Sequence, residues 1–252
     1  MKTLFVYLPC YNEAGNIRAL VEEWVVEQAR LAAEGYDLIV TPIDDKSTDN
    51  TLAIIRQLEK TYPCVRAMAH EQNQNLGGVV NTAIHDFMRI SHQGDVMGLM
   101  DGDDTHKPEY IHAMLAKLSA ERHCVIASRY QPGAAVQGLQ ANRKLFSDGA
   151  RVYYTVMLHV PKVRDYTCGY RVYTRPAILA GFQRYGERLV EMKSFACMME
   201  LLYKLHLSGC VFDEVPFTLH YDCKEGASKM NVWKTVKDSF FTAMKLRFQH
   251  SR

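Results

Sequence analysis

The sequence predicts an α/β fold with a mostly parallel, Rossmann-like sheet flanked by helices. Three observations support this prediction. Short apolar segments alternate with amphipathic segments through the first half of the chain, the amphipathic segments carry apolar residues at helical spacing, and each apolar segment ends in polar residues. Strands that alternate with helices run parallel through right-handed crossovers, and helices then cover both faces of the sheet. Ligands of such sheets bind beyond the carboxyl ends of the strands.

The first half contains five predicted strands and four predicted helices. The first helix shows the pattern clearly, because Ile17, Leu20, Val21, Trp24 and Val25 fall on one face. The strands are predicted at 3–9, 36–43, 64–70, 95–100 and 124–128, and the helices at 12–34, 49–62, 77–90 and 108–119.

This alternation ends after Arg129. The second half is predicted to contain a Gly/Ala/Gln loop at 131–140, helices at 142–160, 194–209 and 231–248, strand-like segments at 165–175 and 210–221, and a polar loop at 224–230. No linker or internal repeat separates the two halves, so we expect a single domain over residues 1–252.

Composition excludes several classes of protein. The net charge of +2 gives no reason to expect a nucleic-acid partner, and no segment approaches the ~20 apolar residues of a membrane span. The first apolar segment is followed by polar residues and lacks a cleavage site, so it is typical of a strand and not of a signal peptide. Seven cysteines, an odd number with no CxxC pair, indicate reduced thiols in a cytoplasmic protein and no structural zinc.

The segment VMGLMDGDDTHKPEYI, residues 96–111, places three aspartates directly after an apolar strand. Asp101, Asp103 and Asp104 repel one another unless a cation relieves the repulsion. Carboxylate oxygens suit Mg²⁺ or Mn²⁺, which keeps several waters and bridges to substrate phosphates. This pattern therefore favours a site for a metal and a diphosphate.

An aspartyl-phosphate phosphatase is the alternative for this segment, because its string also matches Asp-x-Asp-x-Thr. The nucleophile of such a phosphatase normally follows the first core strand. Here three strand–helix units precede the aspartates, so the phosphatase remains a second choice.

Paired aspartates also follow the second strand, in IDDKSTDNT at residues 43–51. Helix capping explains the Ser, Asp and Thr at 47–51, but it does not explain Asp44 and Asp45 together. A carboxylate at this strand end can accept a hydrogen bond from a nucleobase N–H or a ribose hydroxyl. The segment NLGGVVNTA, residues 75–83, is either a phosphate cradle or a close helix–sheet contact, because it lacks the GxGxxG spacing.

Two further groups of residues are candidates for a binding site. Tyr11 and Glu13 in PCYNE follow the first strand, although an exit turn with an acidic helix start explains them equally well. Arg129 and Arg143, with Ser147 one helical turn beyond, bracket the predicted 131–140 loop, and arginine binds phosphate oxygens bidentately.

These motifs together resemble the family-2 glycosyltransferases, and within them the polyprenyl-phosphate sugar synthases of the dolichol-phosphate mannose synthase type. The resemblance extends over nearly the whole chain, in the order PCYNE, DDKSTDNT, NLGGVVNTAI, MDGDDTHKPEYI, SRY, RKLFS, DYTCGYRVYTR, EVPF and GASKM. It implies a GT-A fold in which residues 1–129 bind the nucleotide-sugar and residues 130–252 shape the acceptor side.

The resemblance also implies roles for individual residues. The nucleoside would contact Pro9, Tyr11, Glu13, Asp44 and Asp45. The metal, Mg²⁺ or Mn²⁺, and the diphosphate would be held by Asp101, Asp103 and Thr105, with Asp101, Asp103 and Arg129 as the catalytic set. The acceptor phosphate would be bound by Arg129, Arg143, Ser147 and Lys229.

The implied reaction is an inverting transfer of a sugar from a GDP- or UDP-sugar, most simply to a polyprenyl phosphate. Such an acceptor is already anionic and needs no strong general base. A sugar-hydroxyl acceptor would need a carboxylate base, for which Glu200 and Asp165 are candidates. Both also have structural explanations, since Glu200 is expected on a helix surface and Asp165 is expected to cap a turn. A non-catalytic nucleotide-sugar-binding protein would not need the aspartates and arginines together.

The chain departs from the family pattern near its last loop. Cys223, followed by Lys224, stands where the family usually has an arginine before G-x-S-K, so Lys224 or Lys229 would have to contact the phosphate. The last predicted helix carries aromatic residues among lysines and an arginine. It is predicted either to pack on its own domain or to lie at a membrane interface, which would place this cytoplasmic protein peripherally on the inner face of the membrane.

Overall fold

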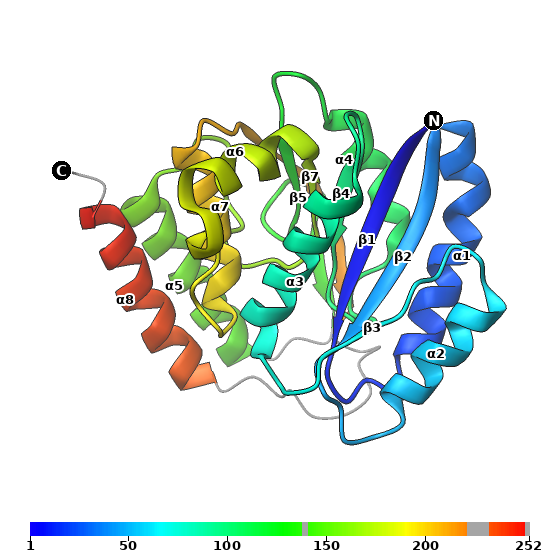
Figure 1. Ribbon diagram of the computed structural model, residues 1–252. Coiled ribbons are helices and arrows are strands. Elements are labelled where there is room, and N and C mark those ends of the chain that lie inside the picture. The colour runs from blue at the N-terminus through cyan, green and yellow to red at the C-terminus, as the bar shows by residue number, and fades with distance from the viewer. Residues whose placement is uncertain (138–140, 221–231, 250–252) are drawn as a thin grey trace.

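The computed structural model describes residues 1–137, 141–220 and 232–249, and of residues 141–148, 232–239 and 249 the backbone alone. A seven-stranded sheet forms its centre, in the order β3-β2-β1-β4-β7-β5-β8 (Figure 1). The strands of this sheet are β1 (Lys2–Cys10), β2 (Tyr36–Asp44), β3 (Met68–Ala69), β4 (Val96–Leu99), β5 (Cys124–Ser128), β7 (Arg171–Thr174) and β8 (Phe212–Pro216). This arrangement confirms the predicted α/β fold with a mostly parallel sheet.

Helices cover both faces of the sheet. One face carries α1 (Ile17–Ala33), α2 (Thr51–Thr61) and α4 (Ile111–Lys117), the last preceded by the 3-10 turn η1 (Pro108–Tyr110). The other face carries α3 (Asn75–Ile90), α6 (Arg175–Tyr185), the 3-10 turn η2 (Gly186–Arg188) and α7 (Ala196–Leu207). Beyond α7, α5 (Ala141–Leu158) and α8 (Val232–Gln249) pack side by side (Figure 1).

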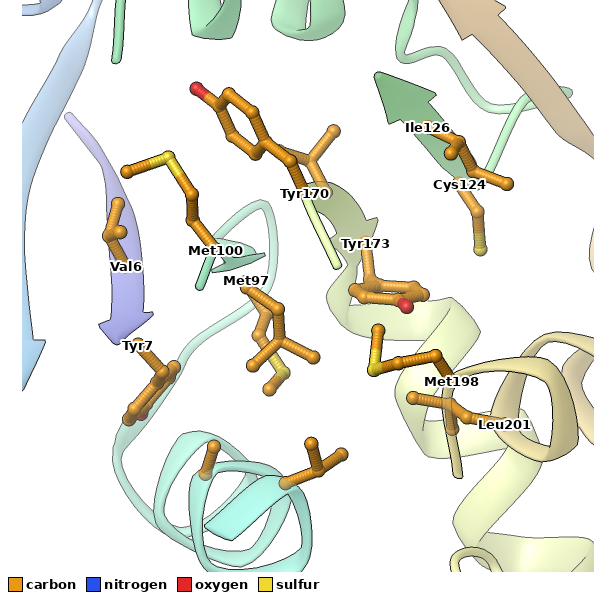
Figure 2. Close-up of a cluster of buried hydrophobic side chains, with 14 of the residues drawn as sticks. Val6, Tyr7, Met97, Met100, Cys124, Ile126, Tyr170, Tyr173, Met198 and Leu201 are labelled. Carbon is orange, nitrogen blue, oxygen red and sulfur yellow. The ribbon is translucent and has the colours of Figure 1, made fainter. Parts of the chain in front are cut away.

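The core lies between the sheet and these helices. Tyr170, on the α1 side, packs edge-to-face on the buried Trp24 and donates a hydrogen bond from its hydroxyl to the Pro108 carbonyl at 3.0 Å. On the opposite side, Met198 and Leu201 of α7 lie near Tyr173 of β7 (Figure 2). The predicted apolar face of α1 is confirmed, since Ile17, Leu20, Val21 and Trp24 are buried and Val25 packs against the core.

Strand β7 is antiparallel to both of its neighbours, β4 and β5. Its first residue, Arg171, pairs with Leu99 at the carboxyl end of β4. The segment 165–170 therefore arrives at the edge of the sheet where β1, β2, β4 and β5 end. This reversal brings the predicted acceptor half of the chain next to the predicted nucleotide half.

Four elements differ from the sequence prediction. The strand predicted at 64–70 shortens to β3 and an isolated bridge between Val65 and Val40, because it lies at the sheet edge with a partner on one side only. The strand predicted at 210–221 divides at Phe217 into β8 and β9 (Thr218–His220). Strand β9 pairs with β6 (Ala135–Gln137), which lies inside the segment predicted as a loop, and α6 was not predicted at all.

The amino-terminal end of α3 is in close contact with residues 190–193. Gly77 donates its backbone N–H to the Lys193 carbonyl at 3.0 Å, and the Asn81 side-chain amide donates to the Val190 carbonyl at 2.8 Å. A Cβ atom added at Gly77 would lie 1.9 Å from the Met192 carbonyl oxygen. The glycine of NLGGVVNTA is thus required for a close backbone contact, but the contact is with the segment 190–193, whereas the helix–sheet alternative predicted a contact with the sheet.

We expect Gly77→Ala to lower the free energy of unfolding by about 1–3 kcal/mol, because the backbone of residues 190–193 must move away. Gly149→Ala is the matched control, since an added Cβ meets no described atom within 4 Å there and alanine favours the helix by about 0.5–1 kcal/mol. Urea unfolding of both variants measures the difference. A Gly77→Ala variant as stable as the wild type would contradict the close contact.

Candidate functional site

The polar residues that follow β1, β2 and β4 are tied together by backbone hydrogen bonds. Asp45 donates its N–H to the Cys10 carbonyl at 2.8 Å, and Gly102 donates to the Pro9 carbonyl at 3.2 Å. A Cβ atom at Gly102 would lie 2.6 Å from that same Pro9 oxygen. The structure therefore brings the PCYNE, DDKS and DGDD segments to one edge of the sheet.

The loops after β1 and β2 also hold each other through side chains. Glu13 is buried; its N–H donates to Thr51 Oγ1 at 2.8 Å, and its Oε2 accepts from the Asn16 amide at 2.7 Å. The Asn12 N–H donates to Ser47 Oγ at 2.9 Å. Tyr11 is exposed at the surface of this loop pair. Glu13 has a clear structural role here, and Tyr11 is the most exposed residue of PCYNE.

The paired aspartates after β2 have different surroundings. Asp45 Oδ1 lies 2.8 Å from His70 Nδ1 and accepts from the Gln74 N–H at 2.8 Å, so it organises the β3–α3 connection. Asp44 Oδ2 accepts from the Ser47 N–H at 3.2 Å. Asp44 Oδ1 is buried without a hydrogen-bond partner, the one carboxylate oxygen in this state among the residues described. A buried carboxylate oxygen of this kind is a ready acceptor for a ligand N–H or O–H.

The three aspartates after β4 separate into two groups. Asp104 accepts from Lys107 Nζ at 2.9 Å, and Lys107 also contacts Glu23 at 2.7 Å. Asp103 Oδ1 accepts instead from the Thr105 hydroxyl at 2.7 Å. Asp101 lies against Gly169, where an added Cβ atom would be 2.6 Å from Asp101 Oδ1. Asp101 and Asp103 form the half-buried pair, and Asp104 belongs to a neighbouring ion-pair cluster.

Arg129 and Asp165 form a charge pair with two parallel hydrogen bonds. Arg129 Nε donates to Asp165 Oδ2 at 2.8 Å, and Nη2 donates to Asp165 Oδ1 at 2.6 Å and to Thr167 Oγ1 at 2.7 Å. Burial alone would raise the pKa of Asp165, but the charge and hydrogen bonds of Arg129 outweigh it and lower that pKa. The Nη1 group donates to no acceptor within the described residues, so its two N–H groups can reach a ligand.

Glu200 and Asp165, the two candidate bases, are engaged within the protein. Glu200 is buried in α7; its Oε2 accepts from the N–H groups of Glu191 and Met192, and its Oε1 accepts from Lys204 Nζ at 2.8 Å. Asp165 is fully buried and also accepts from the Cys168 N–H at 3.0 Å. Both carboxylates therefore organise loops, and the expectation that Glu200 lies on a helix surface is wrong.

A cavity of about 670 Å³ adjoins this edge of the sheet. One wall is formed by residues 69–74 with Gly77, Gly78 and Asn81, and the other by residues 190–193. His70 and Gln74, which line it, both contact Asp45. The volume falls within the range of small-molecule sites. The motif analysis did not identify residues 190–193 as part of the site, because they carry no recognisable pattern and reach it only through the contact with Gly77.

Several predicted residues lie where the structure describes little. Arg143 and Ser147 belong to α5, but of that part of the helix the backbone alone is described. Lys229, Cys223 and Lys224 lie outside the described residues. Within residues 1–137, 141–220 and 232–249, no three His, Cys, Asp or Glu side chains converge as a ready metal site. The Asp101 and Asp103 oxygens still fit Mg²⁺ or Mn²⁺, which fills its coordination with water and substrate phosphate.

The Arg129–Asp165 pair predicts a measurable contribution to stability. We expect Asp165→Asn to lower the free energy of unfolding by about 3–5 kcal/mol near neutral pH, because it leaves the guanidinium without its buried partner. The folded-state pKa of Asp165 is depressed, so this contribution is complete above the ordinary aspartate pKa of about 3.9. It is lost as the pH falls through the lower folded-state value.

The control for this prediction is Glu22→Gln, which removes an exposed ion pair with Arg18 at 3.6 Å and should change stability by less than about 1 kcal/mol. Denaturant unfolding of the wild type and both variants at several pH values measures the effect. If the difference in unfolding free energy between the wild type and Asp165→Asn does not decrease at acidic pH, the assigned charge pair is contradicted.

Comparison with known proteins identifies the family of this chain. The family model described as glycosyl transferase family 2 matches residues 5–182. A dolichol-phosphate mannosyltransferase of Pyrococcus furiosus is 31% identical over 230 residues, which are 89% of this chain and 58% of the relative. The chain thus spans less than two thirds of that protein. A polyprenol monophosphomannose synthase of Mycolicibacterium smegmatis is 28% identical over 94% of this chain and 83% of the relative.

Solved structures show the same fold at low sequence identity. A glucosyl-3-phosphoglycerate synthase of Mycobacterium tuberculosis, in complex with Mn²⁺, UDP and glucosyl-3-phosphoglycerate, superposes with a TM-score of 0.64 at 13% identity, covering 98% of this chain and 80% of that one. A mannosyltransferase of Pyrobaculum calidifontis, in complex with GDP-Man and Mn²⁺, superposes with a TM-score of 0.62 at 16% identity, covering 99% and 65%. The match to the family model, together with this shared GT-A fold, identifies the chain as a member of glycosyl transferase family 2 and favours that family over the phosphatase alternative.

Proposed function

We propose that this protein is a metal-dependent, inverting glycosyltransferase that moves a sugar from a nucleotide-sugar to a polyprenyl phosphate. One observation carries the proposal: among the described residues, a buried carboxylate oxygen without a partner, two half-buried aspartates and a half-buried arginine share one edge of the sheet. Each feature matches one component of the reaction. The carboxylate oxygen matches the nucleoside, the two aspartates match the diphosphate with its metal, and the arginine matches the anionic acceptor. The names of the two sequence relatives support the same acceptor class.

On the donor side, Asp44 is the proposed nucleoside contact. Its Oδ1 has no partner in the part of the chain that the structure describes, whereas Asp45 is already bonded to His70 and Gln74. We therefore assign Asp45, with the main chain of Pro9 and the carboxylate of Glu13, to holding the loops, and Tyr11 to the exposed side of the nucleoside. Both GDP- and UDP-sugars supply the N–H and O–H donors that Asp44 Oδ1 lacks.

Asp101 and Asp103 are the proposed ligands for Mg²⁺ or Mn²⁺. When bound, the ion neutralises charge on the departing nucleoside diphosphate. The chain's own contribution is to hold both carboxylates in place, Asp101 against Gly169 and Asp103 against Thr105. Mn²⁺ accompanies the nucleotide in both structural neighbours named above, which supports this choice of cofactor.

On the acceptor side, Arg129 is the proposed phosphate contact. Asp165 fixes the guanidinium plane and leaves the Nη1 donors available for an anion. The binding site for the acceptor phosphate is proposed to include also Arg143 and Ser147 of α5, and Lys229. Because Glu200 and Asp165 are both engaged in structural hydrogen bonds, neither can readily serve as the base that a sugar-hydroxyl acceptor requires. This favours an acceptor that is already ionised.

The face formed by α5 and α8 is proposed to contact an anionic membrane surface. Val152 and Val156 of α5, and Phe240, Phe241 and Phe248 of α8, are all exposed there. Lys245 and Arg247 are exposed beside them, and neither 149–162 nor 240–249 contains an acidic residue. Exposed apolar side chains accompanied by basic residues suit anionic headgroups. Among the described residues no helix is long and apolar enough to cross a membrane.

The first prediction for this function concerns the aspartates. We expect Asp103→Asn to reduce sugar transfer at least about a hundredfold, because charge stabilisation by the metal contributes several kcal/mol. Asp104→Asn is the matched control: Asp104 faces Lys107, and loss of that pair should cost less than about fivefold. Nucleoside diphosphate release is measured from GDP-mannose, UDP-glucose and UDP-N-acetylglucosamine, with and without a short polyprenyl phosphate.

Three outcomes of that assay are informative. Release that requires the lipid and is lost in Asp103→Asn supports the proposed reaction and identifies the donor. Release that the lipid does not stimulate keeps the glycosyltransferase but rejects the polyprenyl-phosphate acceptor. Equal losses in the two variants would reject the separate role given to Asp103.

The second prediction concerns the α5–α8 face. We expect Phe241→Ser combined with Phe248→Ser to weaken binding to anionic lipid vesicles at least about a hundredfold, since each buried phenylalanine contributes about 1.5–3 kcal/mol. Val26→Ser, at a 77% exposed valine of α1, is the control and should bind as the wild type does. Vesicle co-sedimentation measures the partition, and unchanged binding of the double variant would argue against this face.

A further inference from the structure

A chain of hydrogen bonds runs inward from Asp103 to a buried cysteine. Asp103 Oδ1 lies 2.7 Å from Thr105 Oγ1, which lies 3.2 Å from His106 Nδ1. His106 Nε2 in turn lies 3.6 Å from the Cys168 sulfur. Thr105, His106 and Cys168 are all buried, so their polar atoms need hydrogen-bond partners within the protein.

The number of hydrogens available in this series of contacts fixes the direction of each hydrogen bond. With Asp103 ionised, as a metal ligand must be, its Oδ1 can only accept, and the Thr105 hydroxyl hydrogen must lie in the 2.7 Å contact. The Thr105 oxygen then has no hydrogen left for His106. Nδ1 of His106 must therefore be the donor in the 3.2 Å contact, and this defines the tautomer of the ring.

The other end of the chain agrees with this direction. A neutral ring protonated at Nδ1 leaves Nε2 as an acceptor, and Cys168 must then supply a hydrogen. Burial, reinforced by the nearby charge of Asp165, raises the pKa of the Cys168 thiol well above its usual value. The thiol therefore keeps its hydrogen at neutral pH. Each donor in the series from Cys168 to Asp103 points toward the carboxylate.

Packing holds the His106 ring in the plane that these contacts need. The ring stacks on Phe217, with centroids 5.3 Å apart and planes inclined by 14°, and meets Tyr170 edge-on at 6.0 Å. The Thr105 carbonyl accepts from the His220 N–H of β9 at 3.0 Å, which fixes the adjoining backbone. Neither a ring flip nor a shift of Thr105 is possible without disturbing this packing.

We propose that His106 is a positioning residue that, as the Nδ1-protonated tautomer, orients the Thr105 hydroxyl and through it the metal-binding carboxylate of Asp103. The proposal rests on the proposed function, in which Asp103 binds the metal. It assigns Thr105 to holding a ligand, where the sequence resemblance implied that Thr105 is a ligand itself. Outer contacts of this kind typically change metal affinity by about 10–100-fold.

The first test observes the tautomer directly and does not depend on activity. The ¹⁵N shifts of the His106 ring, measured near neutral pH in the protein without metal or nucleotide, should show a protonated Nδ1 and an unprotonated Nε2. His106→Asn identifies the signal. A ring protonated at Nε2, or at both nitrogens, would overturn the proposal.

The second test compares two amides that replace one ring nitrogen each. His106→Asn places an amide donor near the Nδ1 position and can still reach Thr105, whereas His106→Gln reaches the Nε2 position and loses Thr105. Both variants lose the stacking on Phe217 equally. We expect Mn²⁺ binding, followed by electron paramagnetic resonance with UDP or GDP present, to weaken at least about tenfold in His106→Gln and less than about threefold in His106→Asn.

The two tests separate this inference from the proposed function. Equal loss of Mn²⁺ affinity in both variants would reject the hydrogen-bond role and leave only packing. If the wild-type protein binds no Mn²⁺ with either nucleotide, the metal-dependent function fails while the tautomer result still decides the orientation of Thr105. Thermal unfolding of both variants shows whether either change reflects a loss of fold.

Discussion

Like charges repel, and this chain brings several carboxylates to one edge of a single sheet. The structure meets that constraint by giving the carboxylates donors or cations of their own. Asp45 has His70 and Gln74, Asp104 has Lys107, and Asp165 has Arg129. Once these are satisfied, the oxygens that can serve a ligand are few. Asp44 Oδ1 is the clearest case, because its burial without a partner is favourable only when something else supplies the hydrogen bond.

The reversed strand β7 makes this arrangement possible. A wholly parallel sheet would carry the chain away from its carboxyl edge after β5 and return it through another helix. Because β7 runs antiparallel between β4 and β5, the segment 165–170 reaches the edge directly. That segment supplies Asp165 for Arg129, Cys168 for His106 and Gly169 for the close approach of Asp101. The two halves of the chain therefore share one site and not merely one sheet.

Much of the fold could be predicted because periodicity is a local property. Alternating apolar segments located β1, β2, β4 and β5, and the spacing of Ile17, Leu20 and Trp24 located the buried face of α1. The antiparallel direction of β7 and the pairing of β6 with β9 depend on partners distant in sequence, and no local pattern reports them. The same holds for residues 190–193, which line the cavity only because α3 has a glycine where they cross it.

The site shows the same difference between what a local sequence pattern reports and what depends on distant contacts, here for single side chains. The sequence indicated that Asp44, Asp45, Asp101, Asp103 and Asp104 gather at strand ends, but an aspartate that holds a loop and one that binds a ligand are identical as letters. The two kinds of aspartate differ in which hydrogen-bond donors contact them in the folded protein. His106 is the sharper example: it lies between a threonine and a lysine with no motif of its own, yet its tautomer is tied to the direction of three successive polar contacts. Only the number of hydrogens each group can donate, counted along those contacts, distinguishes a ligand from the residues that hold it.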